Sequence, residues 1–158
     1  MNPELLKEIS IRQLHPSETI PYTLLQDADP SLEVISHYIQ ASEIYLAFLR
    51  HEVIGVFVLY PVDAQTLEIK NIAVEESLQG NGIGTLLLDR ATHIASTKKF
   101  KTLVIGTSNA SIGQLYLYQK NGFEMTGIKT DFFLDHYPEA IFENGIQCKH
   151  MIMLAKQL

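Results

Sequence analysis

The stretch EESLQGNGIG, residues 75–84, decides the fold of this chain. It follows the apolar run Ile72-Ala73-Val74 and leads into an amphipathic segment that begins at Ile83. A strand, a glycine-rich turn and a helix N-terminus together bind anions, because the first backbone N–H groups of a helix have no partner within it. Glycines at positions 80, 82 and 84 let the backbone curl around a ligand without Cβ clashes. We therefore expect a phosphorylated ligand at this turn.

Two other phosphate-binding patterns do not fit the turn. A dinucleotide-binding turn reads G-x-G-x-x-G and has an acidic residue at the end of the next strand, whereas this one reads G-x-G-x-G and the next strand ends at Gly106-Thr107. A loop that binds nucleoside triphosphates has Lys before Ser or Thr, but Gly84 directly precedes Thr85. On this stretch alone, a glycine-rich connection without a ligand stays the alternative.

Length and composition limit the class of protein. A chain of 158 residues with 46% hydrophobic and 19% charged residues predicts a single domain over residues 1–158. Its longest apolar run, residues 53–62, is too short to span a membrane, and the N-terminus lacks the pattern of a signal peptide, so we expect a cytoplasmic protein. The lone Cys148 allows no intrachain disulfide, and the histidines show no metal-ligand spacing, so no metal is expected. The net charge of −6 argues weakly against nucleic acid and is compatible with an amine substrate.

Hydrophobic periodicity predicts an alternating order of strands and helices. Strands are expected over residues 8–14, 43–49, 53–60, 65–74, 103–105, 123–134 and 145–154, with 43–49 and 53–60 forming an antiparallel hairpin. Helices are expected over residues 17–28 and 31–41, from residue 83 to about residue 99, and up to residue 120 from an N-cap at Ser108 or Asn109. In the last helix, Ile112, Leu115 and Tyr116 predict a core-facing stripe, which leaves Tyr118 on its flank.

Two motifs resemble the GNAT superfamily of N-acetyltransferases. Gln79, Gly82 and Gly84 match the signature Q/R-x-x-G-x-G/A directly after a strand, and residues 117–123, LYQKNGF, look like the second conserved segment of that family. Together the motifs cover about residues 66–123. The resemblance implies an α/β fold with a twisted, mostly antiparallel sheet of about seven strands and about four helices on both faces.

The resemblance also implies acetyl-CoA as co-substrate. In this family the turn holds the pyrophosphate, the pantetheine arm pairs with the preceding strand where it splays from its neighbour, and an amide near Ala73 would polarise the thioester carbonyl. The cofactor residues implied in this way are Ile72, Ala73, Val74, Gln79, Gly80, Asn81, Gly82, Ile83, Gly84, Thr85, Asn109, Ser111 and Tyr118. Of these, Asn109 has a simpler role as a helix cap, and Ser111 lies nearer the position at which the family carries its asparagine.

Attack on a thioester needs a neutral amine, and a nearby acid helps the thiolate to leave by giving it a proton. Tyr118 occupies the position of the family's acid, although a packing role is the alternative for a tyrosine there. Glu68 lies where some family members carry a glutamate base that acts through water. A surface carboxylate paired with Lys70 is its alternative.

The loop of residues 135–144 often borders the acceptor site in this family. His136 and Tyr137 are therefore candidate substrate-binding residues, and His136, Tyr137 and Glu139 are rivals of Glu68 as the base. Cys148 is expected to be a buried, inert thiol and not an acyl carrier.

The resemblance implies direct transfer of acetyl to a primary amine of a small molecule or of a protein, in a ternary complex. A non-catalytic acyl-CoA sensor on the same fold is the alternative. We expect no nucleic acid or membrane partner. A homodimer through Phe132, Phe133, Tyr137 and Phe142 is possible, although such residues more often belong to a core.

Overall fold

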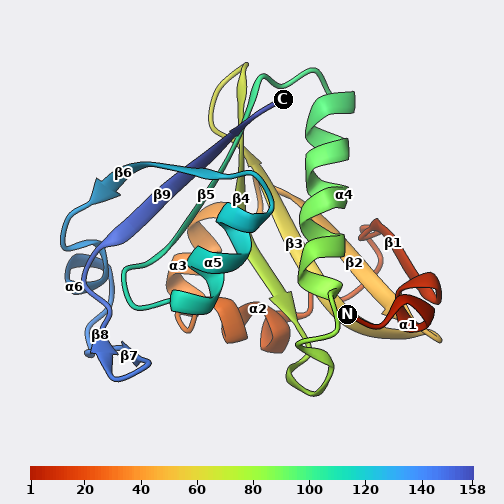
Figure 1. Ribbon diagram of the computed structural model, residues 1–158, viewed down its shortest axis with the longest axis horizontal. Helices are drawn as coiled ribbons and strands as arrows, with labels where there is room; N and C mark the ends of the chain where they lie inside the picture. The colour runs from red at the N-terminus through yellow and green to blue at the C-terminus, as the bar shows by residue number, and fades with distance from the viewer.

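The computed structural model describes residues 1–158 and builds them around one seven-stranded sheet (Figure 1). In chain order the strands are β1 (Ile9–Gln13), β2 (Glu43–Leu49), β3 (Glu52–Pro61), β4 (Thr66–Val74), β5 (Thr102–Ser108), β6 (Glu124–Lys129), β7 (Phe142–Glu143), β8 (Ile146–Gln147) and β9 (Met151–Gln157). The helices are α1 (Pro3–Lys7), α2 (Tyr22–Ala28), α3 (Leu32–Ile39), α4 (Ile83–Thr97), α5 (Ile112–Lys120) and α6 (Phe132–His136), with a 3-10 turn, η1, at Glu76–Leu78.

The sheet runs in the order β1-β2-β3-β4-β5-β9-β6, and a separate hairpin pairs β7 with β8. Every neighbouring pair is antiparallel except β4 and β5, which run parallel. The predicted fold class and the hairpin of β2 and β3 are thus confirmed.

The parallel pair of β4 and β5 gives the sheet its most important irregularity. Its register covers only Thr66–Ile69 against Thr102–Ile105, so the C-terminal half of β4 has no partner on that side. A bulge in β4 lies at this change: Val58 and Leu59 of β3 face Asn71 and Ile69, so Lys70 is the extra residue and β4 bends there. The sheet therefore splays open beside residues 70–74 of β4.

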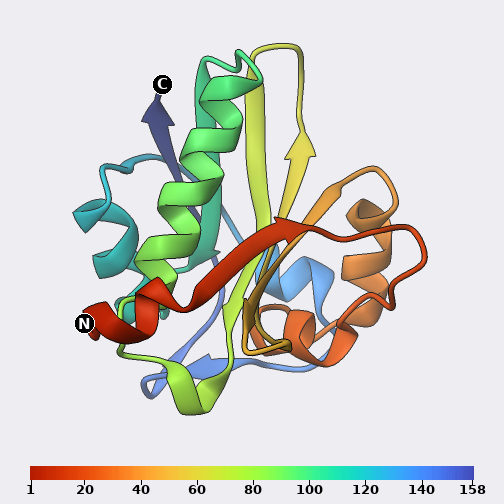
Figure 2. The same cartoon turned by 90° about the vertical axis from the view of Figure 1, so that its right-hand side faces the viewer.

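Two apolar cores cover the two faces of the sheet. One contains Leu87 and Leu88 of α4, and the other contains Leu25 of α2 and Ile35 of α3. Figure 2 shows α4 and α5 on one side of the sheet and α2, α3 and α6 on the other. The extra residue Lys70 reverses the facing of β4, so Ile69 lies on the α4 side and Ala73, four residues later, lies on the α2 side.

Several predicted boundaries were wrong. The helix expected over residues 17–28 begins only at Tyr22, because Pro21 precedes it and the carboxylate of Glu18 is bonded to Arg12 and to the N–H of His15. The strand expected over residues 123–134 ends at Lys129, since Asp131, at a φ of 58°, turns the chain into α6. Helices α1 and α6 were not predicted, because five-residue helices carry too little periodicity.

Candidate active site

The glycine-rich turn presents a row of free donors. None of the backbone N–H groups of residues 80–85 donates to an acceptor in the protein, and the first hydrogen bond of the helix runs from Leu86 N to the carbonyl of Gly82 (3.1 Å). Gly80 and Gly82 have φ values of 78° and 88°, which favour glycine. Such a row at the N-terminus of a fifteen-residue helix fits a pyrophosphate.

The N-terminal segment braces this turn from outside. The N–H of Asn2 donates to the carbonyl of Asn81 (3.1 Å), while the side-chain amide of Asn81 donates to the carbonyls of Leu78 and Gln79. The side chain of Met1 packs against Gly82. The turn is therefore shaped before any ligand arrives.

A groove of about 550 Å³ joins the turn to the splayed part of β4. Its lining includes Ile72, Ala73 and Val74 of β4, the turn residues Gln79, Gly80, Gly82, Ile83, Gly84 and Thr85, and Gly113, Gln114, Tyr116, Leu117 and Tyr118 of α5. The side chain of Gln79 donates to the carbonyl of Val74 (3.1 Å), which closes one end of the turn onto the strand. A free strand edge leading to a row of N–H donors matches the chemistry of a pantetheine arm that ends in a pyrophosphate.

Tyr118 lies at this groove and is buried, with 5% of its surface exposed. Its ring packs against Phe123 at 6.2 Å between centroids, and its hydroxyl makes no hydrogen bond within the protein. Burial raises the pKa of Tyr118 above its ordinary value, and the nearby carboxylate of Glu143 raises it further. The hydroxyl therefore keeps its proton at neutral pH and is available as an acid.

Leu115 of α5 packs against the core as predicted, but the other two residues of the predicted stripe do not. Ile112 and Tyr116 are 51% and 64% exposed, whereas Tyr118 is the buried residue of this helix. Tyr118 lies at the groove and packs against Phe123, so the buried side of α5 is centred on a different position of the helical wheel.

Glu68 and Lys70 form an ion pair at the start of the splay. Nζ of Lys70 lies 3.2 Å from Oε2 of Glu68, whose side chain is only 10% exposed. The same ammonium lies over the rings of Tyr38 and Tyr60, at 6.0 Å and 5.4 Å from their centroids. Glu68 thus pairs with Lys70, as we expected if it were a surface carboxylate, but the side chain of Glu68 is buried. Since Leu67 and Ile69 point into the core beneath α4, Glu68 faces the side of α2 and α3.

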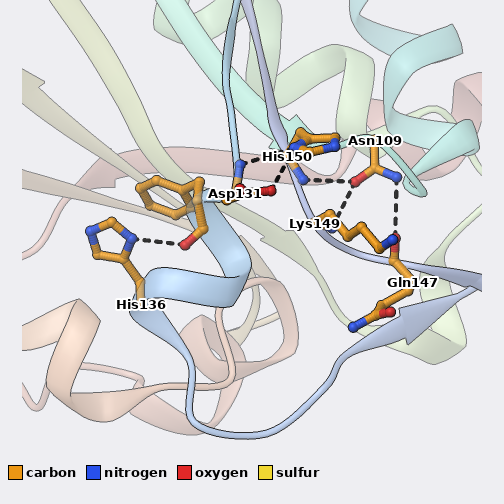
Figure 3. Close-up of polar contacts among 7 residues, drawn as sticks. Asn109, Asp131, His136, Gln147, Lys149 and His150 are labelled. Carbon is orange, nitrogen blue, oxygen red and sulfur yellow. Dashed lines mark hydrogen bonds and ion pairs between the residues drawn. The ribbon is translucent and has the colours of Figure 1, made fainter.

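Asn109 does not cap α5, whose N-cap is Ser111, so the predicted cap was wrong. Its Oδ1 accepts from the N–H groups of Lys149 (2.8 Å) and His150 (3.0 Å), and its Nδ2 donates to the carbonyl of Gln147 (3.2 Å; Figure 3). These partners run from the last residue of β8 to the residue before β9, so Asn109 fastens the β8–β9 connection to the end of β5.

Ser111 also forms a hydrogen bond to the hairpin of β7 and β8. Its hydroxyl donates to Oε2 of Glu143 (2.7 Å). Neither Asn109 nor Ser111 is among the residues that line the groove. Both anchor the hairpin to the start of α5 in this structure.

The two acceptor-loop candidates have different surroundings. Nδ1 of His136 lies 2.8 Å from the carbonyl of Phe132, on whose ring its imidazole stacks, so it is held within α6 (Figure 3). The hydroxyl of Tyr137 instead reaches across the molecule and donates to Oδ1 of Asp29 (2.8 Å). Tyr137 therefore joins α6 to the end of α2, and His136 does not. Of the proposed dimer residues, Phe142 is 63% exposed, whereas Phe132 and Phe133 are half-buried.

Sequence reasoning missed a polar network beside the groove. Asp29 also interacts with the hydroxyl of Tyr38, which accepts from Nδ2 of Asn71 (3.2 Å). Asp27 and Ala28, just before Asp29, line the groove itself. No motif marks these residues, because strands and helices far apart in the chain bring them together.

Two further features of the residues 1–158 bear on ligands. No group of three or more His, Cys, Asp or Glu side chains is arranged to hold a metal ion. None of the helices has the length and apolar character needed to cross a bilayer.

Known proteins share this geometry. The model of the acetyltransferase (GNAT) family matches residues 6–123. The uncharacterized N-acetyltransferase YvbK of Bacillus subtilis is 50% identical over 133 residues, which make up 84% of this chain and 86% of the relative. A GNAT family acetyltransferase from Elizabethkingia anophelis, solved with acetyl-CoA bound, is 52% identical with a TM-score of 0.94, over 96% of this chain and 99% of that one. A Bacillus subtilis acetyltransferase in complex with CoA is 45% identical with a TM-score of 0.89, over 95% and 99% of the two chains.

The family match covers both sequence motifs, and the neighbours that carry acetyl-CoA or CoA superpose on nearly the whole chain. The chain belongs to the GNAT family of acetyltransferases, and it is an acyltransferase that takes acetyl-CoA as its acetyl donor.

Proposed function

We propose that this enzyme transfers the acetyl group directly to a primary amine of a small molecule or of a protein, in a ternary complex. The observation that carries the proposal is the shared groove, in which a buried phenol, Tyr118, lies with the splayed strand around Ala73 and with the free N–H donors of the turn.

Binding is assigned to the backbone. The N–H groups of residues 80–85 would hold the pyrophosphate, and residues 72–74 would pair with the pantetheine arm. The amide near Ala73 would then stabilise negative charge on the carbonyl oxygen of the thioester. Asn109 and Ser111, which we predicted as cofactor contacts, would act indirectly by holding the hairpin beside α5.

Catalysis is assigned to Glu68 and Tyr118. Acetyl-CoA supplies an electrophilic carbonyl carbon. Glu68 accepts a proton from the amine through water as the C–N bond forms, and Tyr118 gives its proton to the departing thiolate as the C–S bond breaks. The proton on Glu68 then returns through water to the phenolate of Tyr118, which restores both groups. Tyr118 can fill the acid role because its hydroxyl lies at the groove and, like any tyrosine of ordinary or raised pKa, is protonated at neutral pH.

Calorimetric titration with acetyl-CoA, followed by free-thiol release against a panel of amines, tests the proposal. Binding with amine-dependent release is expected. Binding without release for every amine would favour a sensor, and absence of binding would overturn the cofactor groove.

A further inference from the structure

Asp29 is a half-buried carboxylate at the end of α2, next to the groove residues Asp27 and Ala28. Its Oδ1 accepts from the hydroxyl of Tyr137 (2.8 Å) and from the N–H of Ser31 (3.2 Å), and Tyr38 contacts the same carboxylate. Burial raises the pKa of Asp29, although these hydrogen bonds act in the opposite direction. The group is thus held in place by neutral donors.

No cation of the protein pairs with this carboxylate. No Lys, Arg or His nitrogen lies within 4.0 Å of Asp29 or of Asp27. The ammonium of Lys70 lies over the ring of Tyr38 and pairs with Glu68. A half-buried carboxylate without a cation leaves negative charge beside the groove, which a cationic ligand would complement.

Asn71 carries an independent sign of a ligand in the same network. It is 4% exposed, and its Nδ2 donates to the carbonyl of Leu25 (2.9 Å) and to the hydroxyl of Tyr38 (3.2 Å). Its Oδ1 has no hydrogen-bond partner, and rotating the amide would place that oxygen against the carbonyl of Leu25. A buried acceptor without a donor is rare in folded proteins and calls for an N–H or a bridging water.

We propose that the acceptor is an amine that carries a second cationic group, and that Asp29, held between Tyr38 and Tyr137, binds this group. The inference rests on the proposed function and deepens it by naming the substrate class. Asp27 and Asp29 make this side of the groove negative, while Glu68 neutralises Lys70.

Three amines with the same four-carbon chain test the proposal: putrescine, butylamine and γ-aminobutyrate, whose far ends are cationic, neutral and anionic. We expect kcat/KM to fall in that order, with putrescine about tenfold or more above butylamine, the ratio that one ion pair of about 1.4 kcal/mol gives. Equal rates, or the reverse order, would overturn the proposal without any variant.

Variants then locate the charge. Asp29→Asn should lower the ratio of putrescine to butylamine about tenfold, whereas Asp89→Asn, an equal charge change on α4 across the sheet, should leave the ratio unaltered. Tyr137→Phe keeps the carboxylate and should retain the preference for putrescine. An Asp29→Asn variant with the wild-type ratio would contradict a role for the charge.

Failure of the proposed function is separable from failure of this inference. If no amine releases thiol, putrescine binding to the CoA-loaded protein is measured by calorimetry for the wild type and for Asp29→Asn. Binding that this variant abolishes would support the cation site by itself, and absence of binding to the wild type would overturn it.

Discussion

Nζ of Lys70 lies 3.2 Å from Oε2 of Glu68, at the point where β4 leaves β5 and the sheet opens. The ammonium also lies over two tyrosine rings, so the pair is fixed between the strand and α3. A carboxylate is thereby held on the splayed strand that carries Ala73, and we propose it as the base.

Replacing Glu68 by Gln should lower kcat/KM about a hundredfold, the lower part of the range for a general base. Affinity for acetyl-CoA should change little, because Glu68 is not among the groove residues. Steady-state kinetics and calorimetry measure the two quantities, with Glu52→Gln at the exposed start of β3 as the matched control. Unchanged turnover in Glu68→Gln would show that another residue is the base.

Tyr118→Phe removes only the hydroxyl that makes no hydrogen bond in the protein. We expect kcat to fall about a hundredfold, while the melting temperature stays close to that of the wild type, because packing against Phe123 is retained. Tyr22→Phe, at an exposed position of α2, is the control. A wild-type kcat in Tyr118→Phe would exclude the phenol as the acid.

Gly82→Ala should weaken acetyl-CoA binding. Its φ of 88° costs an alanine about 1–3 kcal/mol of strain, and the new Cβ would meet the side chain of Met1 at 3.1 Å. Gly145→Ala has a similar φ of 73° in the distant β7–β8 turn, with open space around it. Both variants should lose stability, but only Gly82→Ala should raise the dissociation constant in calorimetry. Equal affinities would argue against the turn as the binding site.

Asn109→Ala should destabilise the fold by about 2 kcal/mol, since it leaves backbone groups of the β8–β9 connection without partners. Asn144→Ala removes one hydrogen bond, to the carbonyl of Ala110, and should cost less. Denaturant unfolding measures both. The opposite order would contradict the fastening role of Asn109.

The ion pair of Arg12 and Glu18 predicts a pH effect. The side-chain hydrogen bond to Arg12 lowers the pKa of Glu18 from 4.5 to about 2. A lowered pKa in the folded state means that the contribution to stability is present above pH 4.5 and is lost as the pH falls towards 2. The wild type should melt at a higher temperature than Glu18→Gln above pH 4.5, and this difference should become smaller as the pH falls towards 2. Added salt should also make the difference smaller, because the ion pair is exposed. A constant difference would contradict the linkage.

Local patterns predicted what depends on neighbours in the chain. The turn, the helix after it and the β2–β3 hairpin were correct, since each is fixed by glycine placement or alternation. The role of Asn109 in the fold could not be predicted, because its partners lie about forty residues away. The contact of Asp29 with Tyr137 was hidden for the same reason, and the burial of Tyr118 depends on how α5 crosses the groove.

The most direct test is mass spectrometry after incubation with acetyl-CoA, first without and then with an amine such as putrescine. We predict an unmodified protein in the first sample, consistent with the buried Cys148, and acetylated amine in proportion to released thiol in the second. Acetylated protein that passes its acetyl group to the amine, or bound acetyl-CoA with no acetylated product for any amine, would contradict direct transfer.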